Sequence, residues 1–505
     1  MKTIESVDAR TGETLGRAAV ETTADQVDAA VARATAAVPW LASQGRAGRA
    51  RLLDDLSTAL ESRADELVET ADRETALGVP RLTGELARTC YQLRFLGRVA
   101  LEGSYLDVSI EHAGATPAGP LPDLRRMNVP VGPIAVFGAS NFPLAFSAPG
   151  GDTASALAAG CPVIVKAHGS HPALSRLVAE VFDATLLRAG APSGVFQLVF
   201  GLDAGTALVR HPGIRAVGFT GSIAGGRALF DLAAARPEPI PFYGELGSVN
   251  PLVVTTAAAE QRGEQIAADL AASLTMGTGQ FCTKPGLLLV PSGPAGDRLV
   301  DRLVTVLGDV GAGHLLNDGI TTAFRSGLAQ LLDDPAVALR FAGAATGRQV
   351  APVLAEARPS DMHTTTAALL IEEYFGPFGL VMRYRSTEEV RDVLSRFPAA
   401  LTGTVHSAGD TDPDLAAIAA WLRERCGRLV FDGYPTGVAV AWGMHHGGRY
   451  PASTSASTSV GASSIARWVH PIAFQNAPAS VLPPELRDDV DEAVPRRING
   501  ILELT

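Results

Sequence analysis

The spacing of apolar residues predicts helices in the N-terminal part of the chain. Between residues 24 and 76, apolar side chains recur every three or four positions, which is the period of helices that bury one face. Residues 81–99 continue this spacing, and their polar positions include Arg88 and Gln92. The Gly/Pro-rich segment 113–123 then predicts a loop or the start of a hairpin.

From about residue 131, short apolar runs alternate with helical spacing. The predicted strands are 133–138, 163–167, 196–200 and 214–221, and the predicted helices are 149–160, 172–190, 203–211 and 225–235. A second alternating region has predicted helices 259–277, 295–308 and 414–425 and predicted strands 286–290, 378–384 and 428–433. Such alternation is typical of parallel sheets with helices on both faces, so the sequence predicts an α/β fold whose first half binds a nucleotide.

Length and charge limit the classes of protein to which this chain can belong. With 505 residues, 47% hydrophobic and 19% charged, the chain is long enough for two or three packed domains. The net charge is −11 and the only lysines are Lys2, Lys166 and Lys284, which argues against a nucleic-acid or anionic-membrane partner. No apolar run reaches the roughly 18–20 residues of a membrane span, and the N-terminus lacks the apolar region of a signal peptide.

Cysteine usage indicates the compartment. Cys90, Cys161, Cys282 and Cys426 lie far apart and form no CxxC pair, and the histidines lack a metal-ligand spacing. The sequence therefore predicts no disulfide framework and no metal site. It indicates a reducing cytoplasm, where each thiol is either buried or reactive.

One glycine-rich segment joins a predicted strand to a predicted helix. In GFTGSIAGG (218–226), Gly221 and Gly226 would let the backbone approach a pyrophosphate at the N-terminus of the helix. The segment lacks the GxGxxG pattern, so a tight turn that needs positive φ is the alternative interpretation.

The segment GQFCTKPG (279–286) places Cys282 in a loop just before an apolar strand. A thiolate in such a loop can reach a cleft, and the flanking glycines leave room for a substrate. The alternative is a buried, unreactive cysteine, which is the role we expect for Cys90, Cys161 and Cys426.

Two further segments place a carboxylate and an amide where they could serve a reaction. In ELGSVNP (245–251), Glu245 follows an apolar run and could act as a general base; the alternative is an ordinary surface carboxylate. In GASNFP (138–143), the Asn141 amide could stabilise an oxyanion; the alternative is an asparagine in an αL turn.

Two segments indicate little by themselves. EEYFGPFG (372–379) is typical of a turn, because an acidic pair and an aromatic residue precede a Gly-Pro step. The Ser/Thr-rich stretch 453–464 has a surface loop as its simplest interpretation.

Together these segments resemble the aldehyde dehydrogenase superfamily over about residues 1–475, because separated motifs occur in that family's order. GASNFP resembles its oxyanion asparagine motif, ELGSVNP its general-base motif and GQFCTKPG its nucleophile motif. VIVKA (163–167) resembles its ribose-binding lysine strand, GFTGSIAGG its phosphate loop and EEYFGPFG a ribose-contact motif. Within the superfamily, stretches 150–172, 226–241 and 431–454 look most like α-ketoglutaric semialdehyde (2,5-dioxovalerate) dehydrogenases.

The resemblance implies oxidation of an aldehyde to a carboxylic acid. Cys282 would attack the carbonyl to form a thiohemiacetal and then a thioester, Asn141 would hold the oxyanion, and Glu245 would activate water. Glu245 favours release of an acid, since members that acylate coenzyme A usually lack this glutamate. The implied cofactor-binding residues are Lys166, Ser170, Gly221, Ser222, Gly226, Glu373 and Phe375.

We expect NADP as the cofactor, with NAD also usable. After the second strand of a dinucleotide fold, a carboxylate would bind the ribose 2′-hydroxyl and repel a 2′-phosphate. Gly169 stands where NAD-preferring relatives often carry glutamate, and Lys166, His168 and Ser170 could donate to a phosphate.

The resemblance implies α-ketoglutaric semialdehyde, oxidised to 2-oxoglutarate, as the substrate. Arg88 and Gln92 are the candidates for binding its distant carboxylate, since arginine binds carboxylates through two parallel hydrogen bonds. The alternative for these two residues is a solvated or ion-paired helix face. Phe142, Phe146 and Phe281 could line an apolar tunnel.

Other functions stay open at this point. An NADP-dependent medium- or long-chain (fatty) aldehyde dehydrogenase is the second substrate class, because that group carries a similar GQFCTKPG loop. A thiol hydrolase would need a histidine beside Cys282, yet His445 and His446 sit in no comparable motif and could instead shape the pocket mouth. A catalytically silent dinucleotide-binding protein would not need Cys282, Glu245 and Asn141 together.

The implied architecture has two Rossmann-type parallel α/β domains and a small bridging element, in a homodimer or a homotetramer. The predicted boundaries are 1–112 and 131–246 for the NAD(P)-binding domain, 247–445 for the catalytic domain, and 113–130 and 475–505 for the bridging element.

Overall fold

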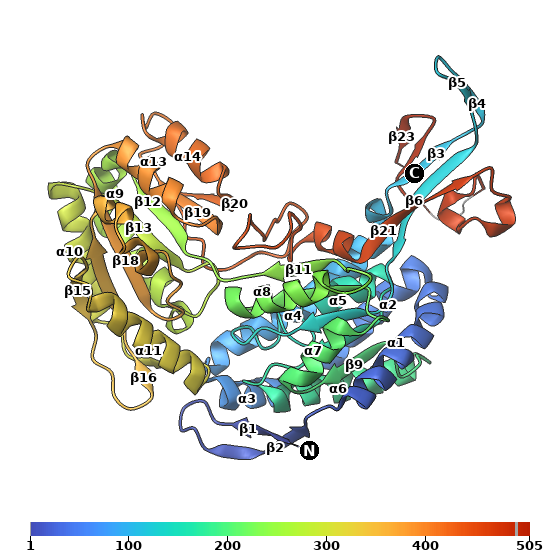
Figure 1. The fold of residues 1–505 in the computed structure, drawn as a ribbon, viewed down its shortest axis with the longest axis horizontal. Helices are drawn as coiled ribbons and strands as arrows, with labels where there is room; N and C mark the ends of the chain where they lie inside the picture. The colour runs from blue at the N-terminus through green and yellow to red at the C-terminus, as the bar shows by residue number, and fades with distance from the viewer. Residues whose placement is uncertain (1, 490–492, 505) are drawn as a thin grey trace.

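Two α/β lobes lie side by side, and a mostly antiparallel sheet projects away from one of them (Figure 1). The computed structural model describes residues 2–489 and 493–504. The predicted α/β class is confirmed, since each lobe is built on a largely parallel sheet covered by helices. Within the described residues, no helix is both long and apolar enough to cross a membrane.

The first lobe contains a five-stranded parallel sheet in the order β11-β10-β7-β8-β9. Its strands are β7 (Ile134–Phe137), β8 (Val163–Lys166), β9 (Phe196–Val199), β10 (Ala216–Thr220) and β11 (Phe242–Glu245). The chain runs outward from β7 to β9 and then returns to place β10 on the other side of β7. In sheets of this kind, ligands bind beyond the carboxyl ends of the strands at this reversal.

Helices cover both faces of this sheet because each has an apolar stripe. They are α1 (Ala24–Ser43), α2 (Gly45–Glu61), α3 (Ala64–Thr75), α4 (Val79–Glu102), α5 (Gly151–Ala159), α6 (Pro172–Arg188), α7 (Leu202–Arg210) and α8 (Ile223–Ala234). One core joins the sheet to α1, α7 and α8, and the other joins it to α2 through α6. The side chains of Thr23 and Gln26 form a capping box that fixes the start of α1.

The second lobe contains a seven-stranded sheet in the order β15-β17-β18-β13-β12-β19-β20, in which only β15 is antiparallel to its neighbour. Its strands are β12 (Asn250–Val254), β13 (Pro285–Pro291), β15 (Ala338–Ala342), β17 (Val353–Ala357), β18 (Phe378–Tyr384), β19 (Ala400–His406) and β20 (Cys426–Phe431). Helices α9 (Thr256–Thr275) and α10 (Pro294–Gly308) pack on one face. The other face packs against α11 (Asp318–Leu332), α12 (Ala367–Leu370), α13 (Thr387–Arg396) and α14 (Leu415–Arg423).

The projecting sheet joins strands from two distant parts of the chain in the order β21-β6-β3-β22-β23. These are β3 (Val108–Glu111), β6 (Leu124–Pro130), β21 (Val469–Gln475), β22 (Arg496–Ile498) and β23 (Ile501–Glu503), and the hairpin of β4 (Gly114–Thr116) and β5 (Gly119–Leu121) extends from it. The hairpin agrees with the sequence expectation for 113–123. Residues 490–492 and 505 of the predicted bridging element lie outside the described residues.

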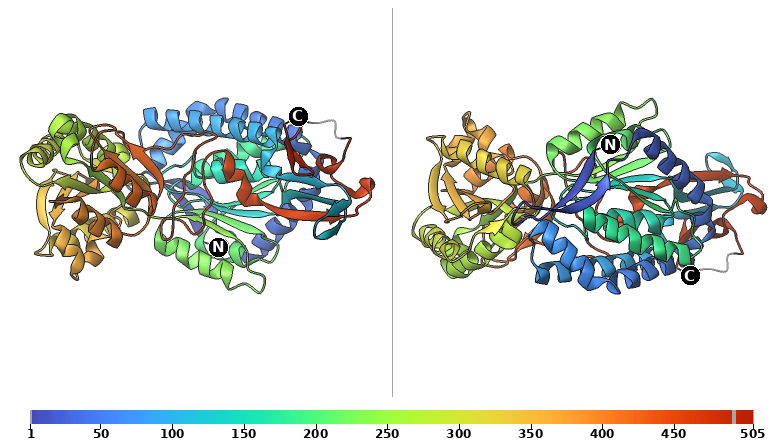
Figure 2. Two further views of the ribbon diagram at one scale, coloured as in Figure 1. Left: turned by 90° about the horizontal axis from the view of Figure 1, so that it is seen from above. Right: turned by 90° about the horizontal axis from the view of Figure 1, so that it is seen from below.

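Two small two-stranded sheets complete the fold. An N-terminal hairpin of β1 (Thr3–Val7) and β2 (Thr14–Val20) reaches toward the second lobe beneath the molecule (Figure 2). A side chain at Gly12, between these strands, would lie 2.6 Å from the Arg348 guanidinium, so the hairpin tip packs on the second lobe. The other pair is β14 (Gly313–His314) with β16 (Gln349–Val350).

The chain returns to the first lobe after β20. This return segment, residues 432–468, ends in a 3₁₀ helix, Ala462–Trp468. The fully buried Trp468 anchors it there, since its indole N–H donates to Ser155 Oγ at 2.7 Å. The return segment therefore brings its own polar residues between the two lobes.

Candidate active site

Cys282 lies in the loop between a 3₁₀ turn, Met276–Gly279, and β13. Gly279 has φ +69°, and a Cβ there would lie 2.2 Å from the carbonyl oxygen of Gly376, so the loop needs glycine at this point. Burial raises the pKa of the Cys282 thiol well above its usual range, and the charge of Glu245 adds to this shift. The free protein thus holds the sulfur as a thiol at neutral pH.

The Asn250 side chain, at the start of β12, holds the backbone of this loop in place. Its Nδ2 donates to the carbonyl oxygens of Cys282 at 2.8 Å and Lys284 at 2.9 Å. Its Oδ1 accepts from the Ser248 hydroxyl and from the Thr402 backbone N–H. Because Asn250 is fully buried, these bonds are shielded from water.

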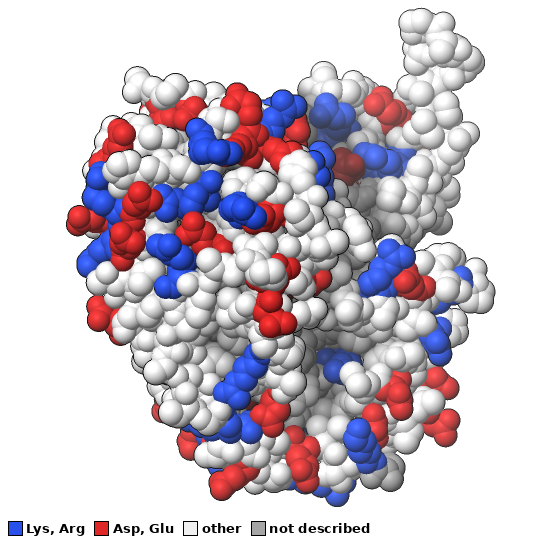
Figure 3. Space-filling model, turned by 60° about the vertical axis from the view of Figure 1, so that its left-hand side comes forward, with Lys and Arg blue, Asp and Glu red and all other residues white. Residues whose placement is uncertain are grey.

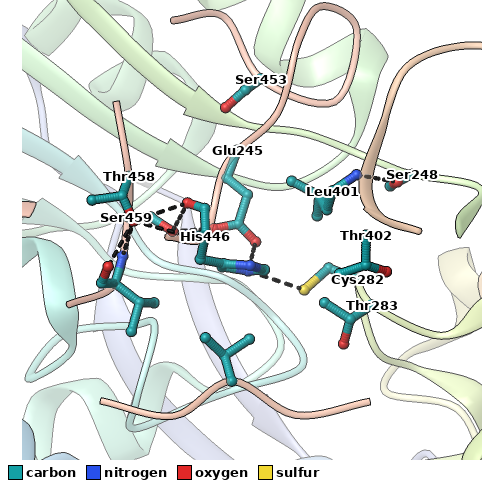
Figure 4. Close-up of polar contacts among 12 residues, drawn as sticks. Glu245, Ser248, Cys282, Thr283, Leu401, Thr402, His446, Ser453, Thr458 and Ser459 are labelled. Carbon is teal, nitrogen blue, oxygen red and sulfur yellow. Dashed lines mark hydrogen bonds and ion pairs between the residues drawn. The ribbon is translucent and has the colours of Figure 1, made fainter. Parts of the chain in front are cut away.

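Glu245 is the last residue of β11 and is buried beside His446 from the return segment (Figure 4). Its Oε1 lies 2.9 Å from His446 Nε2, and its Oε2 accepts the Ser459 hydroxyl at 2.5 Å. Burial raises the pKa of Glu245, but His446 and these hydrogen bonds outweigh burial and bring it below the ordinary value. The carboxylate is therefore ionised and ready to accept a proton.

His446 also contacts the cysteine, because its Nε2 lies 3.7 Å from Cys282 Sγ. The side chain is buried, so the expectation that His446 shapes the pocket mouth is wrong. Its backbone N–H donates to Thr458 Oγ1 at 2.8 Å, which fixes the residue in the return segment.

The interpretation of 453–464 as a surface loop is also wrong. Ser453, Thr458 and Ser459 are buried, and Ser453 forms an isolated bridge with Glu245. The hydroxyl groups that made the stretch look solvated instead bind the Glu245 carboxylate and the His446 backbone.

Asn141 follows β7 at the carboxyl edge of the first sheet and is buried. Its Nδ2 donates to the Gln280 carbonyl oxygen at 2.9 Å, which links it to the loop that carries Cys282. The Asn141 backbone carbonyl accepts from Arg81 Nη2 at 2.6 Å. The amide keeps a second N–H for another acceptor.

A cavity of about 720 Å³ opens beside these residues, beyond the ends of β7, β10 and β11. Among the predicted site residues it is lined by Asn141, Gly221, Ser222, Glu245, Cys282, Glu373 and Phe375. Ser222 caps α8 by accepting from the Gly225 N–H, so free N–H groups of the first turn lie at this end. A cavity walled by a helix N-terminus, a glycine turn and a carboxylate suits a dinucleotide.

Three predicted cofactor residues lie beside this cavity without lining it. Lys166 ends β8, Ser170 Oγ accepts from Asn317 Nδ2 at 2.7 Å, and a Cβ at Gly226 would lie 2.2 Å from Leu246 Cδ2. Gly226 thus allows α8 to pack closely on the chain after β11.

Glu373 lies in a segment whose backbone is held by the buried Lys284. Lys284 Nζ donates to the carbonyl oxygens of Tyr374 at 3.1 Å and Phe378 at 2.9 Å. Burial raises the pKa of Glu373 to about 7, although the charge of Lys284 opposes the shift. The segment containing Glu373 and Phe375 is therefore attached to the strand that follows Cys282.

Helix α4 presents two half-buried arginines, Arg81 and Arg88, to the predicted aromatic residues. The Arg81 guanidinium carbon lies 5.0 Å from the Phe142 ring centre and 4.8 Å from that of Phe281. The Arg88 guanidinium carbon lies 5.1 Å from the Phe146 ring centre. Such stacking favours cations over aromatic faces.

Each of these arginines keeps one nitrogen unpaired, since Nη1 of Arg81 and Nη1 of Arg88 find no hydrogen-bond partner in the part of the chain that is described. Burial lowers the pKa of Arg88, and the charges of Glu85, Cys282 and Glu245 oppose this shift. Gln92, one turn further along α4, is buried and its Nε2 donates to the Ala145 carbonyl oxygen at 3.4 Å.

Sequence reasoning gave no role to Arg81 or Asn250 and assigned His446 wrongly to the pocket mouth. Arg81 has a sequence signal, because it lies seven residues before Arg88 and so on the same face of one helix. Asn250 lies within ELGSVNP, but nothing in that motif distinguished it from its neighbours. His446 had no local signal, since it is 201 residues from Glu245.

The fold and the site define the class of protein, a dinucleotide-dependent oxidoreductase with a cysteine nucleophile and a carboxylate base. The chain belongs to the aldehyde dehydrogenase family, whose sequence model matches residues 1–450. It is an NAD(P)-dependent aldehyde dehydrogenase, and this decides against the thiol hydrolase and the silent binding protein.

Individual relatives agree with this assignment. The chain is 44% identical to alpha-ketoglutaric semialdehyde dehydrogenase 2 of Azospirillum brasilense, covering 91% of this chain and 89% of that one. It is 39% identical to alpha-ketoglutaric semialdehyde dehydrogenase of Acinetobacter baylyi, covering 99% and 96%. Its fold matches the crystal structure of PnpE in complex with nicotinamide adenine dinucleotide, with a TM-score of 0.80 over 96% of each chain at 23% identity.

Proposed function

We propose that this enzyme oxidises α-ketoglutaric semialdehyde to 2-oxoglutarate. The observation that carries the proposal is the pair of half-buried arginines on α4, each with one buried, unpaired nitrogen beside the aromatic residues around Cys282. A buried, unpaired guanidinium nitrogen favours an anionic group, because burial without a partner is costly. The relatives named above act on this aldehyde according to their names.

In the proposed mechanism, the Cys282 thiol loses its proton to solvent and the sulfur attacks the aldehyde carbon to form a thiohemiacetal, which becomes a thioester when it loses its hydride. The free N–H of Asn141 and the Cys282 backbone N–H hold its oxyanion. When bound, the dinucleotide supplies the acceptor for the hydride. Glu245 then takes a proton from water, and this water releases the acid from the Cys282 thioester.

His446 can position both groups but can serve only one at a time. Its Nε2 faces Glu245 Oε1 and Cys282 Sγ, and one nitrogen carries at most one proton. Donation to Glu245 holds the carboxylate in place, whereas release of that bond lets Nε2 accept from the thiol. We therefore assign His446 as a positioning residue between nucleophile and base.

Substrate choice is tested by kcat/KM for α-ketoglutaric semialdehyde, succinic semialdehyde and hexanal. Arg88→Ala should lower kcat/KM for the first aldehyde about 10–100-fold, the cost of one charged hydrogen bond of about 1.5–3 kcal/mol. Hexanal should change less than about threefold, and Arg88→Lys should retain part of the discrimination. Equal losses for all three aldehydes, or a wild-type preference for hexanal, would overturn the proposal in favour of a medium-chain enzyme.

We further propose that NADP is used at least as well as NAD. No carboxylate occupies position 169, and Lys166 offers a positive charge three residues earlier. Burial lowers the pKa of His168 well below its usual range, so this side chain donates as a neutral group and Lys166 carries the charge.

The position of Gly169 gives a clean test of cofactor choice. Nothing lies within 4 Å of a Cβ placed there, so Gly169→Glu fits without steric conflict. The added carboxylate should lower kcat/KM for NADP relative to NAD by at least about tenfold, or roughly 1.4 kcal/mol, whereas the neutral control Gly169→Gln should not. A wild-type enzyme more than about tenfold better with NAD would contradict the proposal.

We also propose a homodimer or a homotetramer assembled through the projecting sheet, in the cytoplasm. Ile472, Ile501, Leu502 and Leu504 are exposed on β21 and in the C-terminal segment that contains β23, which is more apolar surface than a small sheet leaves to solvent. The free thiols, Cys282 among them, suit a reducing compartment. Light scattering tests the assembly, and deletion of residues 499–505 should weaken it.

A further inference from the structure

Three potential metal ligands meet at the centre of the site. Cys282 Sγ lies 3.7 Å from His446 Nε2, which lies 2.9 Å from Glu245 Oε1 (Figure 4). All three donor atoms lie within 4.8 Å of one another, and in the described chain no other group of three such residues does so. These ligands show no metal-ligand spacing along the chain because they come from β11, the loop that carries Cys282 and the return segment.

This set of donors suits zinc. Zn²⁺ binds cysteine sulfur, histidine nitrogen and carboxylate oxygen at about 2.0–2.3 Å, so tetrahedral coordination separates the donor atoms by about 3.3–3.8 Å. The observed separations approach these values, and small side-chain rotations complete the geometry. Magnesium and calcium prefer all-oxygen ligands and do not match a site that contains sulfur.

The surroundings leave one coordination position open. Cys282 and Glu245 line the cavity of about 720 Å³, from which a water molecule can reach a metal ion. The Ser459 hydroxyl donates to Glu245 Oε2, so this carboxylate is oriented by a neighbour as metal-binding carboxylates usually are. Three protein ligands and an open position distinguish such a site from a closed structural zinc site.

We propose that Cys282, His446 and Glu245 form a Zn²⁺ site through which zinc reversibly blocks the enzyme. On binding, the sulfur loses its proton to solvent and forms a bond to Zn²⁺, and no electrons are transferred. The metal ion then binds the Cys282 lone pair that would attack the aldehyde. It also binds the Glu245 carboxylate that would activate water. A chelator removes the ion and restores activity.

The test begins with zinc binding to the enzyme without substrate, by isothermal titration calorimetry. We expect one Zn²⁺ per chain. His446→Ala and Glu245→Gln should each weaken binding at least tenfold, since loss of even an outer partner of a metal ligand costs 10–100-fold. Cys282→Ala should abolish binding, whereas the control Cys426→Ala should bind as the wild type does.

Two measurements on the wild type do not depend on how the variants fold. Co²⁺ in place of Zn²⁺ should give a thiolate charge-transfer band, and Zn²⁺ should protect Cys282 from iodoacetamide, as measured by mass spectrometry of its peptide. Absence of the band and of protection would overturn the proposal, as would zinc binding that His446→Ala leaves unchanged. Because no aldehyde is present, these results are independent of the proposed substrate.

Discussion

Two walls of the active site are built in different ways. The proposed dinucleotide wall, which lines the cavity, consists of Thr220–Ser222 with Glu373 and Phe375. The proposed α4 wall, which lies outside the lining of that cavity, consists of Arg81, Arg88, Phe142, Phe146 and Phe281. The dinucleotide wall contributes the backbone N–H groups of a strand-to-helix turn and the Glu373 carboxylate, whose charge the nearby Lys284 favours. The α4 wall consists of half-buried arginines stacked on aromatic rings.

The difference shows which part of the site is general and which is selective. Backbone groups at a helix N-terminus recognise any pyrophosphate, and every dinucleotide-dependent relative can share them. Unpaired guanidinium nitrogens recognise only an anion of suitable length. Cys282, Asn141 and Glu245 lie between the walls, so one chemistry can serve many aldehydes when only the α4 wall changes.

A further contrast lies in the surface around the site. On the face shown in Figure 3, acidic and basic side chains are intermixed, and a hollow separates two parts of the molecule. No patch of a single charge dominates this face. In the proposed function, selection of an anionic aldehyde therefore rests on the half-buried Arg81 and Arg88 and not on a charged patch of this face.

The largest expected effect comes from removing the Cys282 sulfur, which the reaction needs whatever the two walls bind. Cys282→Ala should lower kcat by about 10⁴-fold or more, the order expected when a covalent nucleophile is lost. Dinucleotide affinity should stay within about twofold, because the dinucleotide wall is unchanged. Absorbance of the reduced cofactor and fluorescence titration measure the two quantities. Acid formation above about one hundredth of the wild-type rate would contradict the assignment of Cys282 as the nucleophile.

Glu245→Gln should separate the two halves of the reaction. Turnover should fall about 10²–10⁴-fold, since general-base catalysis contributes this much, while one equivalent of reduced cofactor per site still forms rapidly. Stopped-flow absorbance resolves the rapid phase from the slow one. If the rapid phase also disappears, Glu245 acts before the thioester forms and the proposed order of steps is wrong.

The sequence predicted the dinucleotide wall better than the α4 wall, for a physical reason. Glycine turns and strand ends are local features, so the loop at 218–226 and the strands before it could be placed from spacing alone. Most predicted strands and helices of the first lobe agree with the structure within a few residues. The β-hairpin at the N-terminus and the strands β12 and β19 were not predicted, because each is an unbroken apolar or mixed run without a distinctive period.

The rest of the site depends on contacts between distant segments. Phe142 and Phe281 were proposed from the sequence as neighbours of the motifs, and Arg88 and Gln92 as partners for a substrate carboxylate, but the surroundings of all four were unknown. His446 reaches Glu245 and Cys282 because the return segment is anchored by Trp468, and no local pattern encodes that path. From the sequence alone, His446 in its glycine-rich segment could therefore not be distinguished from a histidine at the pocket mouth.

Exchange of single residues on each wall should show that the walls act separately. Phe375→Ala should raise KM for the dinucleotide about 2–10-fold, the range of one aromatic contact of about 0.5–1.5 kcal/mol, and leave KM for the aldehyde unchanged. Arg88→Ala should raise KM for the aldehyde and leave KM for the dinucleotide unchanged. The double variant should show the sum of the two free-energy changes, as expected for sites without shared partners. Marked non-additivity would show that the walls are coupled.

The smallest expected effect is a pH dependence confined to the dinucleotide wall. Burial raises the pKa of Glu373 to about 7, so this carboxylate is mostly ionised at pH 8 and mostly protonated at pH 6. Ribose hydroxyls donate more strongly to the ionised form, so KM for the dinucleotide should rise about threefold as the pH falls across this range. Glu373→Gln should remove this dependence, whereas Glu372→Gln, at the exposed neighbouring residue, should retain it. If KM for the aldehyde shows the same pH dependence, the titrating group belongs to the catalytic residues and not to the dinucleotide wall.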